Sequence, residues 1–125
     1  MEKKSEKAPK ELVASARQRG SQGDLCGAVE SLFELVTMYP KDTEVRFFYA
    51  AGLFKLNRYE DAVPELKVVL EAEPVHEWAS LSLFHSLWQT GRREEAMKEL
   101  KRFHRAGGES MEYRRLVKEI IQSDQ

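Results

Sequence analysis

The chain has 125 residues, of which 42% are apolar and 33% charged, and its formal net charge at pH 7 is −1. This composition suits one domain with a core, and the near-zero charge excludes a general electrostatic attraction to nucleic acid or to an anionic membrane. A single cysteine excludes an internal disulfide framework. The sequence has no run of about 18 apolar residues, as a membrane span would require. We therefore expect a cytoplasmic domain with no membrane or nucleic-acid partner.

The first residues, MEKKSEKA, are charged and lack the apolar run of a secretory signal. We expect residues 1–8 to form a flexible charged tail, and residues 9–122 to form a single domain.

After this tail, a period of 34 residues organises the chain. The segments GDLCGA, NRYEDA and GRREEA end at alanines that are 34 residues apart, namely Ala28, Ala62 and Ala96. Pro40 and Pro74 have the same spacing, and Gly108 takes the third position. Alanine lets two helices approach closely, and proline cannot continue a helix. Each period therefore predicts a pair of helices that ends at the proline or glycine.

Within each period, apolar residues recur at helical spacing, and the turn residues Gly23, Asn57 and Gly91 separate two helices. In chain order we predict helices at roughly 9–20, 25–38, 43–56, 59–72, 76–90 and 93–106. A seventh helix is expected at about 111–122, with Ser110 as its N-cap.

The period, the alanine and the closing proline resemble the tetratricopeptide repeat family. The segment LNRYEDAVPELKVVLEAEP is similar to the family pattern, and TGRREEAMKELKRFHRAGG matches in its first half. The first unit departs from the pattern at Ser15 and Arg19, where larger apolar side chains usually pack. The resemblance implies an all-α, right-handed α-α superhelix (solenoid). Its parts would be three repeats at about 9–42, 43–76 and 77–108, followed by a capping helix at about 110–122.

In this family the first helix of each repeat lines a concave groove that binds other proteins. The resemblance therefore implies a non-enzymatic protein–protein interaction module, which binds a protein or peptide segment and needs no cofactor or small-molecule substrate. The groove candidates of this sequence are Arg17, Glu44, Phe47, Lys55, Trp78, Leu81, His85 and Trp88.

The segment HEWASLSLFHSLWQ carries two apolar faces on one helix. Trp78, Leu81, His85 and Trp88 form one stripe, because they are spaced by three, four and three residues. A second stripe is suited to the core and consists of Ala79, Leu83, Phe84 and Leu87. A thin solenoid leaves one face of such a helix toward solvent. The first stripe is then either an open anchor for a partner or a face covered by the tail or the last helix.

Two alternative functions remain open at this point. The domain could be a dedicated chaperone or neutralising, immunity-type partner of one bacterial protein. It could also be a homo-oligomerisation module, with a homodimer burying the stripe. The clamp by which some tetratricopeptide arrays hold a C-terminal carboxylate is absent, because only Arg17 among the corresponding positions could bind one.

No pattern predicts catalysis or a metal site. The three histidines have no ligand spacing with cysteine or carboxylates, and His85 has no orienting acid or nucleophile placed for it. The run RREEAMKELKRFHR pairs Glu99 with Arg102, which favours an ion-paired surface helix over a nucleic-acid site. Cys26 is expected to be a small, half-buried thiol.

Overall fold

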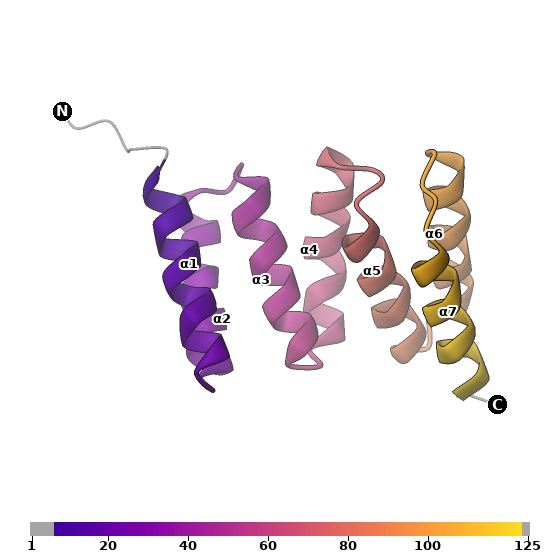
Figure 1. Cartoon of the computed structure of the whole chain (residues 1–125), viewed down its shortest axis with the longest axis horizontal. Coiled ribbons are helices and arrows are strands. Elements are labelled where there is room, and N and C mark those ends of the chain that lie inside the picture. The colour runs from indigo at the N-terminus through magenta and orange to yellow at the C-terminus, as the bar shows by residue number, and fades with distance from the viewer. Residues whose placement is uncertain (1–6, 124–125) are drawn as a thin grey trace.

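The computed structural model describes residues 7–123, and this part of the chain contains seven α-helices and no strand. The helices are α1 (Lys7–Ser21), α2 (Leu25–Met38), α3 (Thr43–Lys55), α4 (Tyr59–Ala72), α5 (Glu77–Gln89), α6 (Arg93–Arg105) and α7 (Met111–Ser123). They follow one another along the long axis of the molecule, with α1, α3, α5 and α7 in front of α2, α4 and α6 (Figure 1). The predicted all-α helical repeat solenoid is confirmed.

The two helices of each pair are joined by a turn with one residue in the left-handed conformation. The backbone angle φ is 101° at Gly23, 59° at Asn57 and 80° at Gly91. Glycine and asparagine adopt this conformation more easily than other residues. The next amide then closes the helix end, as Arg92 N does by donating to Leu87 O at 2.8 Å. The turns predicted at these three residues are confirmed.

The front helices α3, α5 and α7 begin in one register. Their N-caps are Asp42, His76 and Ser110, which are 34 residues apart. Each cap side chain accepts a hydrogen bond of 3.0–3.2 Å from the amide three residues later, in Val45, Ala79 and Tyr113. The predicted cap at Ser110 is confirmed, and α7 therefore starts as the first helix of a further unit would.

Small residues allow the helices to approach one another closely. Ala28, Ala62 and Ala96 are exposed by only 3%, 0% and 0%, so the periodic alanines lie in the core. A Cβ atom on Gly52 would lie 2.7 Å from the side chain of Val29, and α2 and α3 could not then keep this distance. The core that results runs without interruption from α2 to α7.

The junction between α6 and α7 differs from the preceding ones. Within residues 7–123, no Cα atom of α6 lies within 8 Å of one of α7, whereas α3 and α5 both come that close to the helix before them. Tyr113 takes the register position of Val45 and Ala79. Its fully buried ring packs against Phe103, with centroids 4.9 Å apart, and so fills the wider interval.

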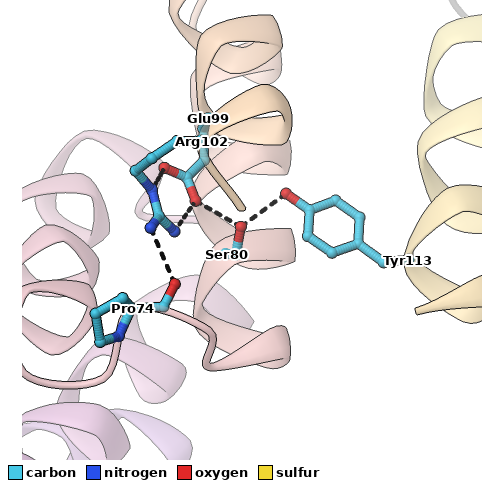
Figure 2. Close-up of polar contacts among 5 residues, drawn as sticks. All are labelled: Pro74, Ser80, Glu99, Arg102 and Tyr113. Carbon is cyan, nitrogen blue, oxygen red and sulfur yellow. Dashed lines mark hydrogen bonds and ion pairs between the residues drawn. The ribbon is translucent and has the colours of Figure 1, made fainter. Parts of the chain in front are cut away.

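A hydrogen-bond network, buried at Ser80, Glu99 and Tyr113, also holds α7 in place (Figure 2). Glu99 accepts two hydrogen bonds of 2.7 Å from Arg102 and one from Ser80 Oγ, and Arg102 donates a further one to the Pro74 carbonyl at 2.9 Å. The Tyr113 hydroxyl lies 2.8 Å from Ser80 Oγ. Ser80 donates its single hydroxyl proton to Glu99, so the Tyr113 hydroxyl is the donor to Ser80 Oγ. Burial raises the pKa of Tyr113, so this hydroxyl stays protonated at neutral pH.

Candidate binding groove

A first cleft lies between α1, α2 and α3 and reaches the start of α5. Its volume is about 590 Å³. The aromatic side chains in its wall are Phe47, Phe48 and Trp78, and its charged side chains are Arg17 and Lys55. The Arg17 guanidinium stacks over the Phe48 ring at 4.4 Å from the centroid, so the cation and the ring form one surface.

A second cleft of about 490 Å³ lies between α3, α5 and α7. It is lined on one side by Trp78, Leu81 and His85, and on the other by Glu119 and Ile120 of α7. Trp78 belongs to both clefts, so its indole is the point where the two meet.

Aromatic rings connect α3 to α5 along both clefts. The Trp78 ring lies edge-on to Phe47 at 5.1 Å and to Phe54 at 5.7 Å between centroids. The Phe54 ring also contacts the His85 ring, with centroids 5.3 Å apart. The His85 ring in turn stacks on Tyr59 at 5.7 Å between centroids. These rings are neither fully buried nor fully exposed. The row thus supports each ring from the side while leaving part of it open to a ligand.

His85 is held in this row as a neutral ring. Burial lowers its pKa, because the charged imidazolium would lose solvation between Phe54 and Tyr59. The nearby Ser82 is only 3% exposed and faces the same cleft. The second cleft therefore carries no histidine charge at pH 7.

The structure gathers most of the predicted groove residues and separates one of them. Arg17, Phe47, Lys55 and Trp78 line the first cleft, and Leu81 and His85 line the second with Trp78. Glu44 lies at the edge of the groove, in a hollow shared with Phe47 and His76. Trp88 instead stacks on the buried Phe84 at 5.7 Å, and the Arg93 guanidinium covers its ring at 4.8 Å.

Residues 34–111 match the family model described as "Bacterial transcriptional activator domain", which is more than half of the chain. The chain belongs to this family. No curated protein matches it in sequence.

Solved structures with the same fold as this domain include several of the protein MamA. MamA RS-1, an ArsTM double mutant, is 19% identical with a TM-score of 0.80 over 97% of this chain and 68% of its own. MamA AMB-1 is 25% identical with a TM-score of 0.70, over 83% of this chain and 57% of its own. A charge-reversal mutant of MamA is 23% identical with a TM-score of 0.68, over 78% of this chain and 72% of its own. These likenesses show a helical repeat fold.

The sequence did not predict every residue that forms the groove of this domain. Phe54 and Tyr59 complete the aromatic row, and Phe54 could have been found because it lies two helical turns after Phe47 on α3. Glu119 and Ile120 were missed because α7 was expected only to cap the array. The 34-residue spacing of the N-caps was the available signal that α7 begins like a groove helix.

Two expectations about single side chains were wrong. Glu99 was predicted on an ion-paired surface, and it does pair with Arg102, but it is only 7% exposed. The reason is that Tyr113 of α7 folds over the Ser80–Glu99 pair. Cys26 was expected to be half-buried and is exposed in the first turn of α2.

Within the described part of the chain, no group of three His, Cys, Asp or Glu side chains is placed to hold a metal ion. None of the described helices combines the length and apolar character needed to cross a membrane.

Proposed function

We propose that this domain is a non-enzymatic interaction module that binds a segment of a partner protein in its groove, in the manner of tetratricopeptide arrays. Trp78 and Phe47 act as the central anchors, and Leu81 and His85 extend the apolar surface toward α7. Arg17, Lys55 and Glu44 frame it, and Trp88 supports the end of α5 next to Arg93.

The observation that carries this proposal is the meeting of two clefts at one partly open tryptophan. Ligand sites are concave and lined by apolar and aromatic side chains with a few polar groups. Both clefts have this character, and Trp78 is shared by them. Tryptophan is also among the residues that most often dominate binding energy at interfaces.

The family description adds a biological setting to this proposal. A transcriptional activator domain that holds a protein segment would act as an adaptor, so we place the partner among the proteins of a bacterial transcription-regulating assembly. The array itself would contribute the docking surface.

The test is selection of 12-residue peptides from a random display library against the domain, followed by affinity measurement by fluorescence anisotropy. We expect Trp78→Ala to weaken the selected peptides by about 30-fold, because a desolvated tryptophan anchor is lost. The matched control is Phe33→Ala, which removes an exposed aromatic ring of α2 that lines neither cleft. Equal loss in both variants would show that the peptides do not bind at the Trp78 clefts. No loss in Trp78→Ala while its thermal midpoint falls would show that Trp78 serves only the core.

A further inference from the structure

The two clefts that meet at Trp78 carry opposite charges. The charged side chains that line the first cleft are Arg17 and Lys55, with no carboxylate among its described lining residues. The second cleft is lined by one carboxylate, Glu119, with no lysine or arginine among the described residues there. Because Trp78 belongs to both clefts, the charge changes sign across this one ring.

Several arginines elsewhere on the described surface are already paired with carboxylates. Arg19, Arg58 and Arg92 each form an ion pair of 2.7–2.9 Å with a neighbouring carboxylate. Arg17 stacks on Phe48 instead, and Lys55 makes no ion pair with the residues that the structure describes. The two cations at the first cleft are therefore left available for a carboxylate from outside the domain.

The second cleft keeps its negative character at neutral pH. Burial lowers the pKa of His85, so the imidazole adds no positive charge opposite Glu119. The other side chains around Glu119 there are apolar or uncharged, including Leu81, Leu116 and Ile120. A cationic side chain of a ligand would meet only one charge in this cleft, and that charge is opposite to its own.

We propose that the groove selects, and fixes the direction of, a partner segment in which an apolar side chain lies between an acidic and a basic residue. The apolar side chain packs on Trp78, the acidic residue lies between Arg17 and Lys55, and the basic residue lies against Glu119. This inference rests on the proposed function and adds the chemistry of the partner to it. Complementary charges at the edge of an apolar contact determine which partner binds and in which direction more than they determine the affinity.

The test uses the same 12-residue peptide library with the full chain and three charge variants. Against the unmodified chain, we expect enriched peptides to carry an acidic residue on one side of an aromatic or aliphatic residue and a basic residue on the other. For one such peptide, the double variant Arg17→Glu with Lys55→Glu should weaken binding by about 25-fold, or about fivefold for each pair. Glu119→Lys should weaken it by about fivefold.

Two controls separate a local charge effect from a change in net charge. Lys98→Glu with Lys101→Glu makes the same change in net charge on exposed residues of α6 and should keep binding within about twofold. Replacing the acidic residue of the peptide by lysine should restore its binding to the Arg17→Glu, Lys55→Glu variant. Restoration identifies the pairing, since a variant that had merely unfolded could not regain affinity.

Each remaining outcome decides between the two proposals. Peptides that depend on Trp78 but show no order of charge would overturn this inference and leave the proposed function standing. Failure to find any Trp78-dependent peptide would overturn both. A dimer in sedimentation velocity that the Arg17→Glu, Lys55→Glu variant abolishes would make a second copy of the chain the occupant and would also overturn the inference.

Discussion

The second helix pair (α3 and α4) and the third (α5 and α6) each contain an arginine that bonds a glutamate and a proline carbonyl. The arginine comes from helices in opposite layers of the array. In the second pair, Arg46 on the front helix α3 donates to Glu65 of α4, and at 2.9 Å to the carbonyl of Pro40. In the third pair, the guanidinium belongs to Arg102 on the rear helix α6.

The acceptors nevertheless correspond. Glu99 and Pro74, which Arg102 contacts, lie 34 residues after Glu65 and Pro40. The register position of Arg46 is taken by Ser80, and the register position of Arg102 is taken by Val68 in α4. The two pairs thus keep the same acceptors, a glutamate and a proline carbonyl. The arginine that bonds them comes from α3 in the second pair and from α6 in the third.

The change has a consequence for the end of the array. Ser80 is much shorter than arginine, and its hydroxyl bonds both Glu99 and the Tyr113 hydroxyl. In the second pair Arg46 takes the position of Ser80, and the following helix has Ala79 at the position of Tyr113. The shift of the arginine to α6 therefore makes room for the contact that holds α7.

The largest expected effect on stability is that of removing the Tyr113 side chain, whose contact with Ser80 has no equivalent in the second pair. Tyr113→Ala should lower the free energy of unfolding by about 3–5 kcal/mol, because a fully buried ring is removed where α6 and α7 are already far apart. Val45→Ala, at the same register position of α3, should cost about 2 kcal/mol. Urea denaturation followed by circular dichroism measures both, and equal losses would contradict the special role of Tyr113.

An intermediate effect is expected when the arginine of the second pair is moved to the rear helix. Arg46→Ser should lower the free energy of unfolding by about 2 kcal/mol, since Glu65 and the Pro40 carbonyl lose their donor. Adding Val68→Arg places a guanidinium at the position of Arg102 and should recover most of this loss. Urea denaturation of both single variants and the double variant measures the coupling. If Val68→Arg changes stability equally with and without Arg46, the two junctions are not interchangeable.

The smallest effect is that of the Tyr113 hydroxyl alone. At pH 8, Tyr113→Phe should cost about 1 kcal/mol, for one hydrogen bond. Burial raises the pKa of Tyr113 above the ordinary value of 10.0, so the folded state loses stability as pH rises above that value, while stability below it is unaffected. The variant has no such loss. We therefore expect the difference between the two proteins to shrink between pH 8 and pH 11. A constant difference would show that Tyr113 titrates normally.

The sequence predicted the helices, the turns and the period of this domain because each of these depends on neighbouring residues. Left-handed turns need residues such as Gly23 and Asn57, and closely packed helices need residues such as Ala62, whatever lies elsewhere in the chain. The register also placed Arg17, Phe47, Lys55 and Trp78 on front helices, and the structure brings these four to one cleft.

The tertiary structure alone decided features that depend on distances between helices. The sequence places Trp88 on the same helix stripe as Trp78. In the structure Trp88 packs between Phe84 and Arg93 and does not line the clefts around Trp78. Glu99 follows a surface pattern along α6 and is buried because Tyr113 arrives from another helix. The charge contrast of the groove likewise depends on α7, since Glu119 meets His85 only after the last helix has packed against α5. Helical periodicity specifies the face on which a residue lies, whereas the neighbour of that face is specified only when the whole chain has folded.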